Sequence, residues 1–278
     1  MRGDSIIYSR FIEEFSLNTP TDLFSLSKSF IGALTGIAIE QGYIHSTSDS
    51  ISKYLPEYSA ILGDSARICD LLNMRLGMFE PHIHSARLYY TPNLCQTTAR
   101  LHHNTPHGEY HYSSNATQIL AFLIEQATGR PLEEYFIDNY WIPCASECEG
   151  FWSLDSKRHR NIRAFCGLCT TPAELLKLGM IYRDKGRLFG RQIVPAEWVE
   201  YTINPPYSAD DREGATYHCQ WYIVNPGQEF LGQGLMGQIL YVNRTTDTIV
   251  ARFGIQRGKT NWTAELGRIS TLPDNLFR

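Results

Sequence analysis

Features that would direct the chain to a membrane or to nucleic acid are missing from the sequence. None of its apolar stretches approaches the ~18 residues that a membrane-spanning helix needs. No run of Lys or Arg occurs, and 25 basic against 29 acidic residues give a formal net charge of -4, which argues against nucleic-acid and anionic-membrane partners. Charged residues make up 19% of the chain and hydrophobic residues 43%, so a globular protein is expected, and a disordered or collagen-like chain is excluded.

Cysteine is present in an odd number, seven, so the thiols cannot all pair within the chain, and their count leaves the compartment open. Cys144 with Cys148, and Cys166 with Cys169, have spacings that would suit the two halves of a four-thiolate zinc site. Cysteine is also a small hydrophobic residue that is commonly buried as a free thiol. The loose spacing of the first pair and the lack of a zinc-ribbon turn favour buried thiols, and we expect no metal.

The hydrophobic pattern predicts an α+β fold in a single domain over residues 1–278. Helices are expected at residues 25–41, 68–73, 115–128, 172–182, after Pro195 and at 262–269. Strands are expected at residues 4–11, 217–224, 237–243 and 247–253, the last two as a hairpin. The sheet region would then combine residues 1–24 with 215–278, and a mostly helical region would occupy residues 45–170.

The strongest chemical signal is Ser25-Leu26-Ser27-Lys28, at the start of a helix that is apolar nearly all round. A spacing of three places Ser25 Oγ and Lys28 Nζ on one helical face, within hydrogen-bonding reach. Burial favours the neutral amine, which can take the proton of the serine hydroxyl. The helix N-terminus adds main-chain N–H groups for a developing oxyanion. A solvated first turn with an incidental lysine is the alternative, but the apolar residues 30–34 leave the lysine few routes to water.

Two further segments contain candidate site residues. Tyr112-Ser113-Ser114 precedes the second apolar helix, where Tyr112 and Ser114 can project from one loop edge and a phenolate can assist proton transfer. By itself this segment is better explained by a packed tyrosine and by Ser114 as the helix cap. Gly232-Gln233-Gly234 enters a strand, where it lets another backbone or a ligand approach, or forms a simple bulge. It is no phosphate loop, because no Lys-Ser or Lys-Thr follows.

The order Ser-x-x-Lys, Tyr-x-Ser and then a glycine-bearing strand resembles the penicillin-recognising serine hydrolases. The chain is most similar to the branch related to class C β-lactamases, which includes esterases, D-aminopeptidases and 6-aminohexanoate-dimer hydrolases. The likeness extends over residues 4–269, and its main segments are FSLSKSFIGALTGIAIEQGYI, YSSNATQILAFLIEQATGRPLEEY and AFCGLCTTPAELLKLG.

The resemblance implies a β-lactamase/transpeptidase-like fold, in which an antiparallel sheet is flanked by helices and a mostly helical region is inserted. It also implies a penicillin-binding-protein-like serine hydrolase that cleaves a small-molecule ester or amide through an acyl-enzyme, without cofactor or metal. Ser25 would be the nucleophile, Lys28 its base and Tyr112 the second proton-transfer group. The N–H groups of Ser25 and Leu235 would form the oxyanion hole, with Gly234 and Ser114 beside the substrate.

Two departures from the family pattern bear on the substrate. Where the family's third motif has Lys or His, this chain has Gly232 and Gln233, so a cation is missing unless Arg252 restores one. Tyr-x-Ser also replaces the Tyr-x-Asn of class C β-lactamases, which fits the esterase and amide-hydrolase branch better. A true β-lactamase or D-Ala-D-Ala peptidase, and a homologue that binds a ligand without turnover, stay open as alternatives.

Two remaining features concern the chain's start and one loop. Only 24 residues precede Ser25, fewer than the family usually has, so an N-terminal strand is expected to be absent here. No signal peptide is seen in MRGDSIIYSR, and an extracytoplasmic location stays open if residues are missing; the oligomeric state is not predicted. His102, His103, His107 and His111 lie in a loop without fixed helical or strand spacing, so we expect them to line the cleft mouth and to bind no metal.

Overall fold

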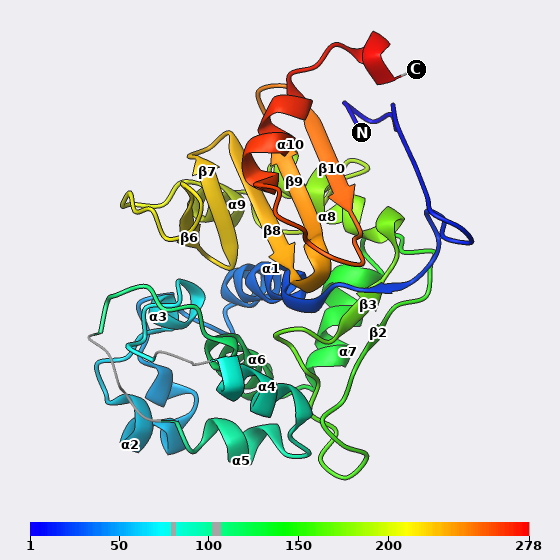
Figure 1. Ribbon diagram of the computed structural model, residues 1–278. Helices are drawn as coiled ribbons and strands as arrows, with labels where there is room; N and C mark the ends of the chain where they lie inside the picture. Colours follow the sequence, from blue (N-terminus) through cyan, green and yellow to red (C-terminus); the bar gives the residue numbers. More distant parts are fainter. Residues whose placement is uncertain (79–81, 102–106, 278) are drawn as a thin grey trace.

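Helix α1 (Ser27–Glu40) is the element on which both halves of the molecule pack. The computed structural model describes residues 1–78, 82–101 and 107–277. A half that contains the main sheet lies on one side of α1, and a mostly helical half lies on the other (Figure 1). Every residue of α1 from Ser27 to Ala38 is buried, which is why its sequence is apolar nearly all round.

The main sheet is antiparallel, and its strands follow one another in both sequence and space, in the order β10-β9-β8-β7-β6. Its members are β6 (Thr216–His218), β7 (Trp221–Asn225), β8 (Glu229–Gly234), β9 (Gln238–Asn243) and β10 (Thr248–Arg252). The predicted β9–β10 hairpin is present, with Thr248 opposite Asn243. The predicted strand at 217–224 is wrong as a single element, because Cys219 and Gln220 have φ of 47° and 69° and turn the chain between β6 and β7.

Helices cover both faces of this sheet. Helices α8 (Pro172–Arg183) and α9 (Ala196–Ile203) pack on one face, and α10 (Trp262–Ser270) on the other (Figure 1). The close approach of α8 requires Gly179, since a Cβ there would lie 2.6 Å from the Ile249 side chain. Thr171 caps α8 by accepting a hydrogen bond from Glu174 N, as the capping-box pattern predicts. The Glu174 carboxylate instead accepts from the main-chain N–H of Glu147.

The predicted strand at residues 4–11 is wrong. Residues 6–12 have no regular secondary structure, and apolar side chains such as Ile6 and Phe11 are exposed there, so the segment has no sheet partner. Near the N-terminus only Arg2 bridges to the main sheet, at Thr248, with Ile249 N donating to Met1 O at 2.9 Å. Strand β1 (Thr21–Asp22) belongs to a separate small sheet with β3 (Leu168–Thr170) and β2 (Phe151–Trp152).

The helical half is built around α6 (Ser114–Thr128), which packs against α1. Gly129, with a left-handed φ of 66°, ends α6 close to the predicted residue. Helix α3 (Ile68–Leu72) also lies where the sequence predicts it. The remaining short helices of this half are α2 (Ser59–Leu62), α4 (His82–Tyr90), α5 (Leu94–Thr98) and α7 (Leu132–Phe136). Within the described part of the chain, no helix has both the length and the apolar composition to cross a membrane.

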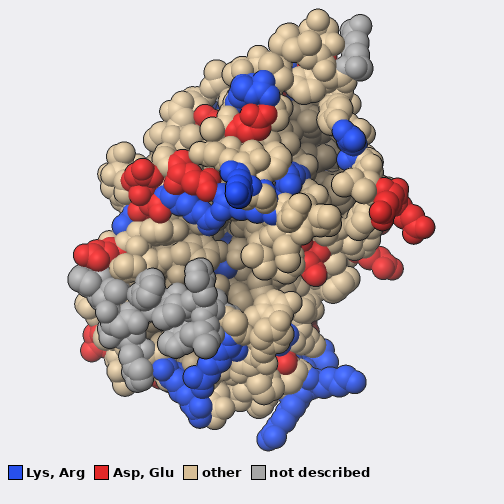
Figure 2. Space-filling view, in the orientation of Figure 1, with Lys and Arg blue, Asp and Glu red and all other residues tan. Residues whose placement is uncertain are grey.

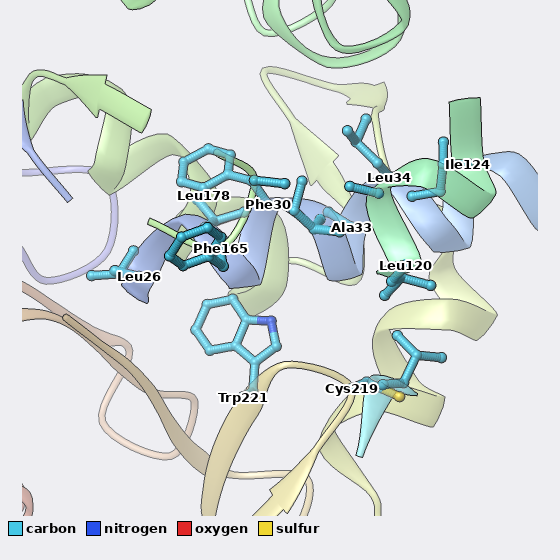
Figure 3. Packing of buried hydrophobic residues seen from close by; sticks show 14 of the residues in the cluster. Leu26, Phe30, Ala33, Leu34, Leu120, Ile124, Phe165, Leu178, Cys219 and Trp221 are labelled. Atoms are coloured by element: carbon cyan, nitrogen blue, oxygen red, sulfur yellow. The ribbon is translucent and has the colours of Figure 1, made fainter. Parts of the chain in front are cut away.

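The hydrophobic core is continuous across the two halves because α1 contributes to both. Leu120 and Ile124 of α6 approach α1 from one side, and Cys219 and Trp221 of the β6–β7 hairpin approach it from another (Figure 3). All four side chains are fully buried. This packing holds the N-terminal end of α1 in a fixed place between the sheet and the helical half.

Candidate active site

Ser25 lies in a single 3-10 turn (Phe24–Leu26) that leads directly into α1. The turn is anchored by the fully buried Leu23 and Leu26, while Ser25 itself is half-buried. Strand β8 runs against this turn, and its glycines make the approach feasible. A Cβ at Gly234 would lie 2.1 Å from the main-chain oxygen of Leu23. The third sequence motif is therefore needed to bring β8 next to Ser25, rather than to form a simple bulge.

Lys28 is the most unusual side chain of the site because only 1% of its surface is exposed. Its Nζ lies 3.2 Å from Ser25 Oγ, so the spacing of three does bring the two side chains together. The same Nζ donates a 2.7 Å hydrogen bond to the main-chain oxygen of Phe165 and lies 3.5 Å from Ser114 Oγ. The amine thus has oxygen atoms of Ser25, Ser114 and Phe165 within 3.5 Å.

Tyr112 and Ser114 reach the same point from the N-terminus of α6. The Tyr112 ring centroid lies 5.0 Å from Lys28 Nζ. The interpretation of Ser114 as the helix cap is wrong: Ser113 is the cap, and its Oγ accepts from Ala116 N at 3.2 Å. Ser114 is instead the first residue of α6, which leaves its hydroxyl directed at Lys28. The second motif therefore joins the first in space.

This arrangement has the elements of proton-transfer chemistry at a serine. When the amine is neutral, its lone pair can accept the proton of the Ser25 hydroxyl 3.2 Å away while an N–H bond donates to Phe165 O. Water is largely excluded from the amine, so its interactions with the three oxygens are stronger than they would be in solvent. The N–H groups of Leu26 and Ser27 already donate to Leu23 O and Phe24 O in the turn before α1.

The residues expected to complete the site lie at the end of β8. Leu235 follows Gly234, the last β8 residue paired with β9, and its side chain is 62% exposed. Arg252 is bound elsewhere: its guanidinium donates to Gly237 O at 2.5 Å and to Gln256 O at 3.3 Å. Its carbon also lies 4.0 Å from the Trp262 ring centroid. Arg252 therefore holds the loop after β8 in place, and these contacts give no support to a role as the missing cation.

The cysteines that suggested zinc are free thiols. Cys144, Cys166 and Cys169 are buried, Cys148 is half-buried, and burial raises the pKa of Cys144 and of Cys166 to about 12. Across residues 1–78, 82–101 and 107–277, no three His, Cys, Asp or Glu side chains lie close enough together to hold a metal ion.

The histidine cluster can be followed only in part, since His102 and His103 lie outside the described residues. His107 Nε2 lies 3.1 Å from Asp70 Oδ2, and His111 Nε2 lies 3.5 Å from Glu109 Oε2. These two histidines thus contact different carboxylates.

Sequence reasoning missed two parts of the site. The first is the Phe165 carbonyl, a main-chain group whose position cannot be predicted from the type of residue that carries it. The second is a group of tyrosines beside Tyr112, which includes Tyr217, with its ring centroid 6.1 Å from that of Tyr112. Tyr217 was assigned only to a strand, and the alternation of YHCQWY did not show which ring would face the site.

Comparisons with known proteins identify the family and the fold of the chain. The family model described as Beta-lactamase matches residues 1–261. The 6-aminohexanoate-dimer hydrolase of Paenarthrobacter ureafaciens is 23% identical over 280 residues, which cover 91% of this chain and 70% of that protein. A solved Bacillus anthracis protein, provisionally named 6-aminohexanoate-dimer hydrolase, superposes with a TM-score of 0.82 at 21% identity, covering 95% of this chain and 74% of that one. A provisionally named β-lactamase from Bacteroides dorei gives a TM-score of 0.74 at 16% identity, covering 99% and 91%. The predicted β-lactamase/transpeptidase-like fold is confirmed.

Proposed function

The chain belongs to the β-lactamase family, and from that premise we propose that it is a serine hydrolase that cleaves an ester or amide bond through an acyl-enzyme on Ser25. The observation that carries the proposal is the placement of Lys28 Nζ, buried and 3.2 Å from Ser25 Oγ. A lysine in this position has the geometry of a general base for the serine hydroxyl.

In the acylation step, Ser25 Oγ forms a bond to the substrate carbonyl carbon while its proton passes to Lys28 Nζ. The carbonyl oxygen becomes an oxyanion, for which we assign the N–H groups of Ser25 and Leu235 as donors. The bond to the leaving alcohol or amine then breaks, and the leaving group takes up a proton. Tyr112 is assigned to that transfer because its ring lies 5.0 Å from Nζ. The products of this step are the acyl-enzyme and the free alcohol or amine.

Deacylation repeats the same transfers with water as the nucleophile. Water adds to the acyl carbon and gives one proton to the Lys28 and Tyr112 pair, and the C–O bond to Ser25 breaks as Oγ recovers its proton. The carboxylic acid leaves and the enzyme returns to its starting state. Gly234 and Ser114 are assigned to contact the bound substrate, since β8 and the α6 N-terminus flank Ser25.

The experiment that tests the function is covalent labelling with a fluorophosphonate, which reacts with activated serines. Mass spectrometry of the digested protein is expected to place one adduct on Ser25. The matched control is Ser29→Ala, since Ser29 lies one turn further along α1 and its hydroxyl donates to Gln220 O at 3.0 Å. Ser29→Ala should label like the wild type, and Ser25→Ala should not label.

Two results would contradict the proposal. An adduct on Ser27, Ser29 or Ser114 would mean that another hydroxyl is activated. No adduct on the folded wild-type protein would favour the alternative of a homologue that binds its ligand without turnover.

A further inference from the structure

A row of tyrosines leads away from Lys28 along one side of the site. Tyr112, whose ring is 5.0 Å from Lys28 Nζ, lies edge-on to Tyr217 at 6.1 Å between ring centroids. Tyr217 in turn contacts Tyr222 at 4.8 Å, its register partner across the β6–β7 hairpin, and Tyr110 at 5.6 Å. The rings extend from the proposed reaction centre to β7, and β8 lies between β7 and the turn that contains Ser25.

Arg212 lies at the far end of this row. It is half-buried, its Nη1 donates to the Tyr222 hydroxyl at 3.4 Å, and its guanidinium carbon lies 5.6 Å from the Tyr222 ring centroid. Burial lowers the pKa of Arg212, the Tyr222 phenol raises it, and the net direction is upward, so the side chain stays charged. A guanidinium has five N–H donors, and the phenol accounts for one of them.

The carboxylates next to Arg212 in sequence are bound to other arginines. Asp211 pairs with Arg75 at 2.8 Å, and Glu213 pairs with Arg257. Among the described residues, no carboxylate lies within ion-pair distance of Arg212. Removing a cation from water without an anionic partner is unfavourable. Arg212 therefore has a positive charge and N–H donors beyond the one bound to Tyr222, and it lies beside the Tyr222 ring. These properties suit the binding of an anion.

A hollow with charges of both signs lies at Glu213, the residue that follows Arg212. Arg257 and Lys259, on the loop between β10 and α10, line this hollow of about 250 Å³ together with Glu213. That loop lies against the end of β8, since a Cβ at Gly237 would come within 3.3 Å of Arg257 Cα. Figure 2 shows a band of Lys and Arg side chains on the upper left part of one face of the molecule, with Asp and Glu side chains next to it.

We propose that Arg212 binds a carboxylate carried by the substrate, several bonds away from the reacting carbonyl. The proposal rests on the proposed function, because it assigns the substrate class of the same site. A carboxylate is preferred because its two oxygens match the planar guanidinium fork. Tyr217 and Tyr222 are buried, so an acyl chain of a few methylene groups would lie over the half-buried Tyr112 between Ser25 and the half-buried Arg212.

The test compares two p-nitrophenyl esters, the butyrate, which is neutral, and the mono-ester of adipic acid, whose acyl chain ends in a carboxylate. Arg212→Gln should lower kcat/KM for the adipate mono-ester by ~10- to 100-fold, the range expected for a lost bond between charged groups. It should change kcat/KM for the butyrate by less than about threefold, since the neutral chain makes no such bond. Arg244→Gln is the matched control, because that arginine pairs with Glu200 at 2.9 Å, beyond the end of β9 that is farther from Gly234, and it should affect the two esters equally.

A second measurement separates failure of this proposal from failure of the proposed function. Adipate binding to the Ser25→Ala protein, with and without Arg212→Gln, is measured by titration calorimetry and needs no turnover. Weaker adipate binding in the Arg212→Gln protein supports the carboxylate site. If the wild type also hydrolyses neither ester, that second result counts against the hydrolase function but not against the carboxylate site. Equal binding with and without Arg212, or equal losses on both esters, would overturn the carboxylate site and leave the hydrolase standing.

Discussion

The Nζ atom of Lys28 lies 2.7 Å from the main-chain oxygen of Phe165, a shorter distance than to either serine hydroxyl. A lysine side chain has four rotatable bonds and needs such a contact to stay in one place. The contact also uses one N–H bond, which leaves the lone pair of a neutral amine free to face Ser25. The proposed base is therefore positioned from outside its own helix, by a carbonyl of the segment that leads to β3.

Replacement of Lys28 tests its assignment as the base. Lys28→Ala removes the amine, and Lys28→Arg keeps a positive charge that cannot release its proton at working pH. Both substitutions are expected to lower the rate of fluorophosphonate labelling at Ser25 by at least ~10²-fold, the lower range for a lost acid–base group. Stopped-time labelling followed by mass spectrometry measures the rate. A Lys28→Arg protein that labels at the wild-type rate would show that Lys28 is not the base.

Gln118 is predicted to be a positioning residue for the same amine. Its buried side chain donates to Ile162 O at 3.1 Å and accepts from Ala164 N at 3.1 Å, so it fixes the segment that ends in Phe165. Gln118→Met keeps the volume but removes both bonds. Ala164 N still donates to Ile162 O at 3.0 Å, so we expect a loss of about 0.5–1.5 kcal/mol for each bond removed. The carbonyl that holds Lys28 should also shift, and the pH profile of labelling should shift with it.

The matched control for Gln118 is Thr117→Val. Thr117 is buried on the same helix, and its hydroxyl donates to Gln220 Oε1 at 2.8 Å, away from residues 162–165. Both variants should lose thermal stability, but only Gln118→Met should change the pH profile. If the two variants lose stability and labelling in parallel, Gln118 is merely structural.

Tyr112→Phe tests the second proton-transfer group. The change removes one oxygen and keeps the ring that contacts Tyr217 and Lys28, so the fold should be retained. Loss of an acid–base group is expected to lower kcat by a factor of ~10²–10⁴. Tyr110→Phe is the control, since Tyr110 also packs on Tyr217 but is not assigned to proton transfer. A similar loss in both variants would assign the effect to the tyrosine row as a whole.

The elements that the sequence predicted are those with local signals. Helix α6 ends at a glycine, α8 begins with Thr171 and Pro172, and the β9–β10 hairpin has a polar turn of the usual length. The turn at Cys219–Gln220 lacks the Gly, Asn or Asp that normally marks left-handed residues, and tertiary contacts support it instead. Gln220 Nε2 donates to Leu72 O at 2.9 Å, which ties the turn to α3.

For the site, sequence predicted side chains and their spacing but not their surroundings. The spacing of Ser25 and Lys28 required their proximity, and the order of motifs suggested that Tyr112 would join them. The Phe165 carbonyl has no side-chain signal, and Arg212 became notable only once Asp211 and Glu213 were seen to bind other arginines. Pairing of this kind depends on the tertiary structure and leaves no local pattern.

Glu125 is predicted to make stability fall as pH rises. Burial raises the pKa of this α6 carboxyl from 4.5 to about 7, while its Oε1 accepts from Leu132 N at 3.0 Å. Between these two pH values the folded protein keeps a proton that the unfolded chain has released, so the free energy of unfolding falls across this window. The loss is complete above about pH 7 and absent below pH 4.5.

Glu125→Gln should remove this dependence, because the amide keeps the acceptor oxygen and cannot ionise. We expect the melting temperature of the variant to exceed that of the wild type by a few degrees at pH 8 and to match it at pH 4.5. Differential scanning calorimetry across this range measures the difference. A constant offset between the two proteins at all pH values would show that Glu125 does not titrate within the window.

The preference between neutral esters and β-lactams is the last prediction, and it depends on the charge that β8 lacks. Penicillins and cephalosporins have a carboxylate beside the scissile ring, and the family's third motif supplies a cation there. Here the aligned residues are Gly232 and Gln233, and Arg252 is held by Gly237 O, Gln256 O and the Trp262 ring. Arg212 contacts the Tyr222 hydroxyl and ring rather than β8. Losing a hydrogen bond to a charged group lowers affinity or rate by roughly one to two decades, whereas a neutral ester loses nothing. We therefore expect kcat/KM for p-nitrophenyl butyrate to exceed kcat/KM for nitrocefin and for any penicillin. A lysine introduced into β8 should restore activity on β-lactams. Gly232 is a poor position for it, because a Cβ there would lie 2.9 Å from Ser29 Oγ. Gln233→Lys is therefore the better variant. Gln233→Lys should raise kcat/KM for nitrocefin and leave that for the butyrate unchanged, and a wild-type preference for nitrocefin would show that the protein is a β-lactamase without the usual cation.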